Sequence, residues 1–159
     1  MKILVTGSAG FVGKNLCANL ELNDKYEVFR FDLDTEKTLL DKYCEECDFV
    51  VHLAGVNRPE NPDEFAKGNS GFTGELLETL KNKNNKCPVL ITSSIQAILD
   101  NPYGKSKKEA EDFLFAYGEE TGAEIFVYRM PNVFGKWCRP NYNSAVATFC
   151  NNIANDLPI

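Results

Sequence analysis

A tyrosine and a lysine four residues apart, Tyr103 and Lys107, are the side chains in this sequence best suited to transfer a proton. Asn101 and Pro102 precede them and indicate a helix start, because Asn caps a helix N-terminus and Pro suits its first position. Residues at i and i+4 share one helix face, so the two side chains are neighbours. An ammonium group lowers the pKa of a nearby phenol, and such a pair can protonate or deprotonate a carbonyl or carbinol oxygen. An ordinary surface pair has the same spacing.

Three hydroxyl residues, Thr92, Ser93 and Ser94, end or follow an apolar run that predicts a strand over 89–92. Ligands of open α/β sheets bind beyond the carboxyl ends of the strands, so a hydroxyl there can hydrogen-bond a reacting oxygen. We select Ser94 because it lies immediately past the apolar strand. A hydroxyl at a strand end also commonly caps the next turn, which is the alternative. With the tyrosine and lysine, Ser94 completes the predicted catalytic set.

A glycine-rich stretch from Thr6 to Gly13 reads T-G-x-x-G-x-x-G and lies between an apolar strand and a helical pattern. Gly7 permits a sharp turn, Gly10 lets the backbone approach a pyrophosphate, and Gly13 allows close packing of the helix on the sheet. The helix N-terminus offers free N–H groups to phosphates. A glycine turn without a ligand is the alternative. The predicted dinucleotide loop consists of Gly7, Ser8, Ala9, Gly10, Phe11, Val12 and Gly13.

Asp32 ends the second predicted strand, where a carboxylate accepts hydrogen bonds from the adenosine ribose and repels a 2′-phosphate. Arg30 lies two residues earlier, on the same strand face, and is placed to offset that repulsion. Asp32 can equally belong to a segment that contacts adenine. The sequence therefore leaves NAD and NADP both open as cofactors, and we expect NAD(H) to be accepted alongside NADP(H).

Strands and helices alternate along the chain, which predicts an α/β fold of the Rossmann-like, doubly wound kind, with a mostly parallel sheet and helices on both faces. Little sequence separates the second strand from the next helix, so we expect one edge strand to be missing. The strands are predicted at 2–6, 27–32, 49–53, 89–92 and 125–128, and the helices at 12–20, 35–46, 72–80 and 102–117.

The chain has 159 residues, of which 43% are hydrophobic and 25% charged, as expected for one soluble globular domain. Its net charge of −6 argues against binding to nucleic acid or anionic lipid. No apolar window reaches the length of a membrane span, and the apolar N-terminal segment is too short for a signal peptide. We therefore expect a cytoplasmic protein that binds neither nucleic acid nor membrane.

The sequence has six cysteines, which we expect to be reduced, and one histidine. Cys44 and Cys47 form a C-x-x-C, but no second pair completes a zinc site. We interpret them as thiols turned inward at a helix end, with metal or redox use as the alternative. His52 lies in an apolar strand, which favours a role in the core over one as a general base. We predict no metal site.

These motifs resemble those of the extended short-chain dehydrogenase/reductase family, the nucleotide-sugar epimerases, dehydratases and reductases. His52 to Gly55 resembles the family's H-x-A-G beneath the cofactor, Gly68-Asn69 its supporting asparagine, and Arg129 to Gly135 its R-x-x-N-x-x-G stretch. The resemblance implies a Tyr–Lys–Ser catalytic set. The further cofactor contacts that it implies are Leu53, Ala54, Gly55, Asn69, Tyr103, Lys107, Arg129, Pro131 and Asn132.

Longer stretches at 52–59, 93–97 and 134–144 are similar to the CapF-type capsular-polysaccharide reductases. That resemblance implies NAD(P)H-dependent reduction of the C4 keto group of a UDP-2-acetamido-2,6-dideoxy-hexos-4-ulose, toward UDP-N-acetyl-L-fucosamine, by a homodimeric enzyme. Trp137 to Tyr142 can also be a simple loop anchor. The implied UDP-sugar contacts are Asn57, Arg58, Ser94, Gln96, Asn132, Trp137, Arg139, Asn141 and Tyr142.

Enzymes of that type continue into a substrate domain and a cupin domain. We expect residues 1–159 to be one NAD(P)-binding domain, the cofactor half of such an enzyme. Two other functions remain. One is an epimerase or dehydratase with bound NAD, although Ile95 and Gln96 stand where dehydratases often carry an acid pair. The other is a non-catalytic dinucleotide sensor, although such proteins tend to lose the tyrosine or lysine, and both are present here.

Overall fold

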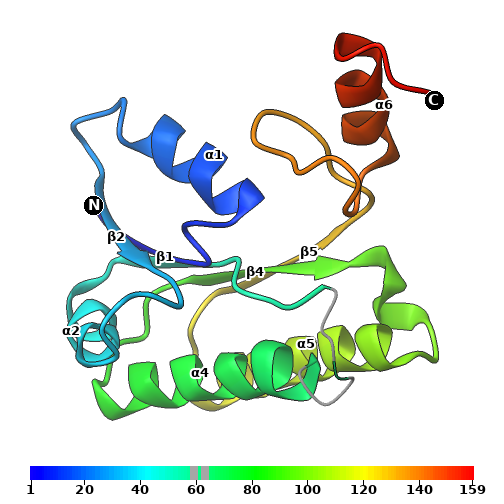
Figure 1. The fold of residues 1–159 in the computed structure, drawn as a ribbon. Helices are drawn as coiled ribbons and strands as arrows, with labels where there is room; N and C mark the ends of the chain where they lie inside the picture. Colours follow the sequence, from blue (N-terminus) through cyan, green and yellow to red (C-terminus); the bar gives the residue numbers. More distant parts are fainter. Residues whose placement is uncertain (58–60, 62–64) are drawn as a thin grey trace.

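A computed structural model describes residues 1–57, 61 and 65–159, with only the backbone of 66 and 67. Five parallel strands form one sheet in the order β2-β1-β3-β4-β5 (Figure 1). The chain reverses its direction of winding between β1 and β3, which is where ligands bind in such sheets. The strands are β1 (Lys2–Thr6), β2 (Glu27–Phe31), β3 (Phe49–His52), β4 (Val89–Ser94) and β5 (Ile125–Met130).

The predicted α/β architecture is confirmed, with helices on both faces of the sheet (Figure 1). α1 (Phe11–Leu20) covers one face, and α2 (Thr38–Glu46), α4 (Phe72–Asn82) and α5 (Pro102–Thr121) cover the other. The larger apolar core lies between the sheet and these three helices, and a smaller one lies beneath α1. In the described part of the chain β2 is an edge strand, with no further strand beside it.

Several boundaries differ from the predicted ones. Ser94 is the last residue of β4 rather than the first one past it, because β4 pairs with β5 through Ser94. Asp32 falls just outside β2, where its backbone N–H donates to the Thr35 hydroxyl (2.9 Å) in a turn that delays the start of α2. A short π-helix, η1 (Ala66–Gly71), and a 3₁₀ turn, η2 (Ile95–Ile98), were not predicted.

Helix α5 begins and ends as its sequence signals require. The Asn101 side chain accepts a hydrogen bond from the Gly104 N–H (2.7 Å), and Pro102 takes the first helical position. Gly122 ends the helix with a left-handed φ of 77°. The helix thereby projects its first two turns, which carry Tyr103 and Lys107, toward the carboxyl ends of the strands (Figure 1).

The sequence analysis did not predict helix α6 (Ala145–Ala154), although the signals are present. The Ser144 side chain caps its N-terminus, and Val146, Phe149 and Ile153 recur at helical spacing. None of its residues is buried, and it stands away from the sheet (Figure 1). No helix in the described part of the chain is both long and apolar enough to cross a membrane.

All six cysteines are free thiols. Cys44 and Cys47 are buried at the end of α2, as predicted for inward-facing thiols. Cys47 Sγ lies 3.7 Å from the Sγ of Cys87 and also donates to the Cys44 carbonyl oxygen (3.9 Å). Among the described residues, no group of three or more His, Cys, Asp or Glu side chains is placed to hold a metal ion.

Candidate active site

Tyr103, Lys107 and Ser94 lie together at the carboxyl edge of the sheet. The Lys107 ammonium lies 6.0 Å from the centre of the Tyr103 ring and donates to the Thr92 carbonyl oxygen (3.4 Å). Ser94 hydrogen-bonds to the Tyr103 side chain. A phenol, an ammonium and a hydroxyl therefore converge at one point, as proton transfer to a bound oxygen requires.

The pKa values of this group differ from the expectation that lysine lowers the tyrosine pKa. Burial raises the pKa of Tyr103, and the hydrogen bond from Ser94 only opposes that rise. Burial also lowers the pKa of Lys107 to about 8, with the Glu111 carboxylate acting in the opposite direction. The expectation was wrong, because burial dominates the pKa of Tyr103 and the Lys107 ammonium lies 6.0 Å from the ring centre. Tyr103 is a neutral proton donor here.

The three hydroxyls at the end of β4 have separate partners. Ser93 Oγ donates to a Glu111 carboxylate oxygen (2.5 Å), and Thr92 Oγ1 donates to the His52 carbonyl oxygen (3.5 Å). Ser94 Oγ accepts from the Gln96 N–H (3.1 Å) and thereby caps η2. Ser94 also hydrogen-bonds to the Tyr103 side chain, so its turn-capping contact is compatible with the predicted catalytic role.

The glycine loop packs so closely that side chains are excluded at two positions. A Cβ at Gly7, where φ is 68°, would lie 2.7 Å from the Ala54 nitrogen, and one at Gly13 would lie 2.1 Å from the Gly7 carbonyl oxygen. At Gly10 the same contact is 3.1 Å. No side chain caps the N-terminus of α1, and no acidic residue lies in its first turn. These features suit a pyrophosphate at the helix N-terminus.

Asp32 adjoins this loop, and its carboxylate accepts from the Ala9 N–H (2.7 Å). The suggestion that Arg30 offsets its charge toward a 2′-phosphate finds no support in the contacts of Arg30. The Arg30 guanidinium instead forms a two-point ion pair with Glu21, the residue that caps the C-terminus of α1 (2.9 and 2.7 Å). Asp32 therefore presents its negative charge beside the loop without neutralisation by Arg30.

His52 lies in a buried chain of hydrogen bonds beneath the loop. Its Nδ1 lies 2.6 Å from Thr6 Oγ1 and its Nε2 lies 2.9 Å from Thr73 Oγ1. Thr73 donates its own proton to the Asn69 carbonyl oxygen (2.8 Å), so it accepts from Nε2–H. Thr6 accepts from the Ala54 N–H and donates to Nδ1. The imidazole is thus a neutral structural link, as predicted, and not a general base.

The buried environment of His52 should make the stability of the fold depend on pH. Burial, aided by Lys107, lowers the pKa of His52 to about 3, below an ordinary value of 6.5. Between these pH values His52 is protonated in the unfolded chain and neutral in the folded chain. The free energy of unfolding therefore falls as the pH drops from about 6.5 toward 3. We expect about 2 kcal/mol of loss by pH 4.5 from this group. Urea unfolding of the wild type and of His52→Gln at about pH 6.5 and pH 4.5 checks this expectation. The variant should lose less unfolding free energy between the two pH values, because it has no histidine at position 52. An imidazole NMR signal that titrates near pH 6.5 contradicts it.

Asn69 connects the strand-three loop with α5. Its side chain accepts from the Val56 N–H (2.8 Å) and donates to Ser106 Oγ (2.9 Å). A Cβ at Gly55 would lie 2.8 Å from Asn69 Oδ1 and 2.9 Å from Lys107 Nζ. A side chain at position 55 would therefore displace the end of the Asn69 or the Lys107 side chain. Asn69 belongs to η1, and such π-helical turns are frequent at functional sites.

The stretch after β5 folds back over the glycine loop. Asn15 of α1 donates to the Lys136 carbonyl oxygen (2.7 Å), and Gly135 lies beside the Phe11 ring. Asn132 donates to the Asn143 carbonyl oxygen (2.7 Å) and is exposed, as is Pro131. The contacts place this stretch over the same edge of the sheet as the glycine loop.

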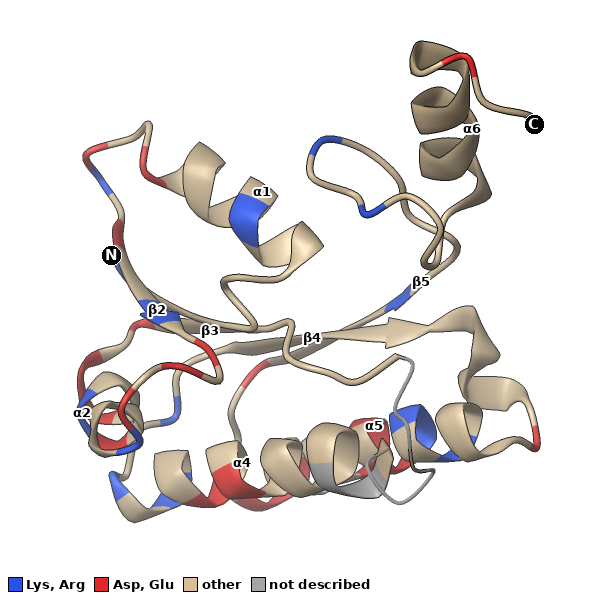
Figure 2. Ribbon diagram, viewed as in Figure 1, with Lys and Arg blue, Asp and Glu red and all other residues tan. Residues whose placement is uncertain are grey.

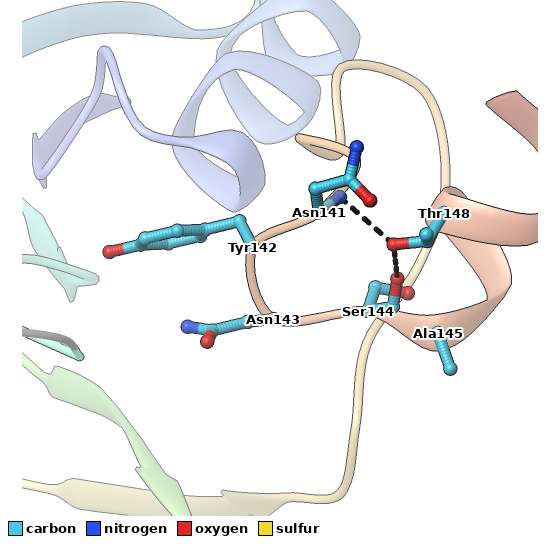
Figure 3. Close-up of a pocket in the computed structure, with 6 residues that line it drawn as sticks. All are labelled: Asn141, Tyr142, Asn143, Ser144, Ala145 and Thr148. Atoms are coloured by element: carbon cyan, nitrogen blue, oxygen red, sulfur yellow. Dashed lines mark hydrogen bonds between the residues drawn. The ribbon is translucent and has the colours of Figure 1, made fainter. Parts of the chain in front are cut away.

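The loop between β5 and α6 carries two basic residues, Lys136 and Arg139, and no acidic one (Figure 2). Lys136 lies over the Trp137 ring (4.3 Å) and Arg139 over the Tyr142 ring (5.7 Å). Trp137 and Asn141 adopt positive φ angles of 66° and 55°, which cost energy for residues with side chains. An open pocket of about 490 Å³ here is lined by Asn141, Tyr142, Asn143, Ser144, Ala145 and Thr148 (Figure 3).

In Figure 3 the Tyr142 and Asn143 side chains point away from α6. The Asn141 N–H donates to Thr148 Oγ1 (2.9 Å), which fixes the loop to α6. Of the other predicted substrate contacts, Asn57 and Gln96 are exposed, and Arg58 lies outside the described residues. The loop is therefore anchored to the helix while it leaves aromatic and cationic groups accessible.

Sequence reasoning missed Glu111. Its side chain is fully buried, and its carboxylate accepts from Ser93 and from two nitrogens of Arg129 (2.9 and 2.6 Å). Arg129 was predicted as a cofactor contact, and here its guanidinium binds Glu111. The available signal was the position of Glu111 four residues after Lys107, on the same helix face.

Comparisons of the sequence and of the structure with known proteins point to the same family. Residues 3–159 match the model of the NAD dependent epimerase/dehydratase family. Over all 159 residues the chain is 53% identical to a UDP-2-acetamido-2,6-beta-L-arabino-hexul-4-ose reductase of Pseudomonas aeruginosa, and it spans 43% of that protein. It also superposes with a TM-score of 0.88, at 47% identity, on the capsular polysaccharide assembling protein CapF of Staphylococcus aureus, covering all of this chain and 43% of that one. A UDP-glucuronic acid 4-epimerase of Bacillus cereus in complex with NAD shares the fold at 23% identity, with a TM-score of 0.84, and the match covers 99% of this chain and 65% of that one.

Proposed function

The chain belongs to the NAD dependent epimerase/dehydratase family, and we propose that it is the cofactor half of a reductase acting on a UDP-linked 4-keto sugar. The substrate is a UDP-2-acetamido-2,6-dideoxy-hexos-4-ulose, reduced at C4 in the synthesis of a surface-polysaccharide precursor, UDP-N-acetyl-L-fucosamine. Support for this substrate comes from the likeness to the Pseudomonas reductase, which extends over the whole chain.

One observation carries the proposal: the Tyr103 hydroxyl, bonded to Ser94, lies one helical turn from the buried Lys107, at the sheet edge that holds the glycine loop. Ser94 orients the C4 oxygen, and Tyr103 donates its proton to that oxygen as the carbonyl becomes an alcohol. Lys107 stabilises the phenolate that remains. Burial keeps competing water away from the pair.

The residues of this chain fit a dinucleotide. Gly7, Gly10 and Gly13 leave space for a pyrophosphate at the uncapped N-terminus of α1, and Asp32 faces the position expected for the adenosine ribose. Lys107 and Asn69 would hold the nicotinamide end. A reduced nicotinamide, when bound, supplies the hydride that C4 receives.

The direct test mixes the purified natural-length protein with the 4-keto UDP-sugar and NADH or NADPH. We expect loss of the reduced-nicotinamide absorbance, in a one-to-one ratio with a product whose C4 carries a hydroxyl by NMR. Conversion of the sugar without net use of reduced dinucleotide would instead indicate an epimerase or dehydratase. Dehydration is disfavoured because Ile95 and Gln96, beside Ser94 on η2, offer neither acid nor base.

A second prediction concerns cofactor choice. Because Arg30 is held by Glu21, nothing in its contacts shields a 2′-phosphate from Asp32. We expect the wild type to accept NADH alongside NADPH, and Asp32→Asn to improve the kcat/KM for NADPH relative to NADH about tenfold. Asp34→Asn removes the same charge two residues further on, at an exposed position, and should leave the ratio unchanged. An unchanged ratio in Asp32→Asn shows that this carboxylate does not read the ribose.

The complete protein is, in this proposal, a cytoplasmic homodimer that binds a UDP-sugar and has a substrate domain beyond residue 159. The homodimer is what the resemblance to the CapF-type reductases implies, and the exposed Phe113 and Phe115 side chains of α5 are candidates for contacts between copies. Sedimentation of the natural-length protein as a monomer at micromolar concentration would count against the dimer.

A further inference from the structure

A buried carboxylate joins three elements next to the proposed catalytic pair. Glu111 lies on α5, Ser93 on β4 and Arg129 on β5, and the two partners donate three hydrogen bonds to Glu111 at 2.5, 2.9 and 2.6 Å. The Glu111 side chain is fully buried, whereas the Arg129 side chain is 41% exposed. A buried charge is costly unless it is paired and hydrogen-bonded, and these contacts meet both requirements for Glu111.

The position of Glu111 relates it to Lys107. The two residues are four apart on α5, and Lys107 is itself four residues after Tyr103, so all three share one helix face. Ser93 precedes Ser94 directly on β4. The Glu111 contacts therefore join α5 to both β4 and β5. They hold α5, which carries Tyr103 and Lys107, against the end of β4 that carries Ser94.

We propose that Glu111 is a positioning residue of the reductase site, which fixes α5 against β4 and β5 and supplies a negative charge one helical turn from the Lys107 ammonium. The effect of Glu111 on catalysis rests on the proposed function. The electrostatic coupling of Glu111 to Lys107 does not depend on which substrate the enzyme uses. The reaction needs Lys107 protonated when Tyr103 gives up its proton, and Glu111 favours that charged form.

Among the residues that the structure describes, the other charged or titratable groups around Lys107 do not replace this charge. Tyr103, on α5 itself, is neutral, and His52, on β3, is neutral and buried. Arg129, on β5, is positively charged and is bound to Glu111. Thr92 offers only its carbonyl oxygen, at 3.4 Å, and η1 contributes the neutral side chain of Asn69 beside the Lys107 ammonium. Burial disfavours the ammonium, and Glu111 opposes that effect.

The test compares Glu111→Gln with Glu109→Gln, an identical change at an exposed position of the same helix. Side-chain NMR of labelled lysines, with the Lys107 signal assigned from its loss in Lys107→Met, follows the titration of Lys107 directly. We expect Glu111→Gln to lower the midpoint by about one pH unit and Glu109→Gln to leave it in place. Arg129→Gln removes a positive charge and should move the midpoint upward, a reversal of sign that a purely structural role does not produce.

Kinetics give the second readout in the natural-length enzyme. With a midpoint lowered by about one unit from about 8, the deficit in kcat should grow from about twofold at pH 7 to nearly tenfold above pH 8. A loss that is the same at every pH, together with an unmoved Lys107 midpoint, overturns the proposal. If the wild type reduces no keto sugar, the proposed function fails while the NMR titration still decides whether Glu111 acts on Lys107.

Discussion

Tyr103→Phe should reduce the rate of keto-sugar reduction by about 10² to 10⁴ while dinucleotide affinity stays within about threefold of the wild type. The substitution removes one hydroxyl and leaves the ring, which packs at the start of α5. In the proposed reaction that hydroxyl donates the proton, and burial raises its pKa, which keeps it protonated at neutral pH. Single-turnover measurement of hydride transfer, with dinucleotide binding by calorimetry, separates the two effects.

Tyr117→Phe is the matched control. Tyr117 lies on the same helix and is buried, and its hydroxyl donates to the Asn85 carbonyl oxygen (3.0 Å), away from the site. Its loss should cost about 1 kcal/mol of unfolding free energy and leave the rate unchanged. Wild-type turnover by Tyr103→Phe would show that another group donates the proton, and an equal loss in both variants would indicate general damage to α5.

Much of the fold followed from local signals. The glycine loop, the Asn101–Pro102 helix start and the apolar strands each predict a structure through short-range physics, and their elements lie where expected. The motif residues also converge because parallel strands and their following loops share one edge of the sheet. Ser94 and Tyr103 meet there despite lying on different elements.

The missed features depend on distant partners. Glu111 resembles any helix glutamate until Ser93 and Arg129 are known to lie beside it. The partner of Arg30 is Glu21, on another element, so the strand pattern alone placed Arg30 toward the cofactor. The pKa of Tyr103 depends on desolvation, which spacing does not reveal. Helix α6 was not predicted, although its apolar spacing and its Ser144 cap are readable in the sequence, and none of its residues is buried.

The largest effect on folding is expected from the glycine loop, at Gly13. A methyl group there would lie 2.1 Å from the Gly7 carbonyl oxygen and 2.7 Å from the Ser8 Cα, both backbone atoms that cannot rotate away. Gly13→Ala must therefore push α1 away from the loop that follows β1. We expect it to lower the free energy of unfolding by about 3 kcal/mol, at the upper end of the cost of overpacking. Urea unfolding measures this loss.

Substitution of Gly10 should affect dinucleotide binding much more than the stability of the fold. Its added methyl group meets only the Gly7 carbonyl oxygen, at 3.1 Å, so the Gly10→Ala fold should lose less than about 1 kcal/mol. Dinucleotide affinity should nevertheless fall about 100-fold, because the backbone at this position must approach the pyrophosphate. Gly74→Ala in α4, where the nearest atom is 3.8 Å away, is the control and should preserve both properties. If Gly10→Ala binds dinucleotide normally, the pyrophosphate does not lie over this turn. If Gly13→Ala is as stable as the wild type, α1 does not pack as closely on the Gly7–Ser8 loop as the structure shows.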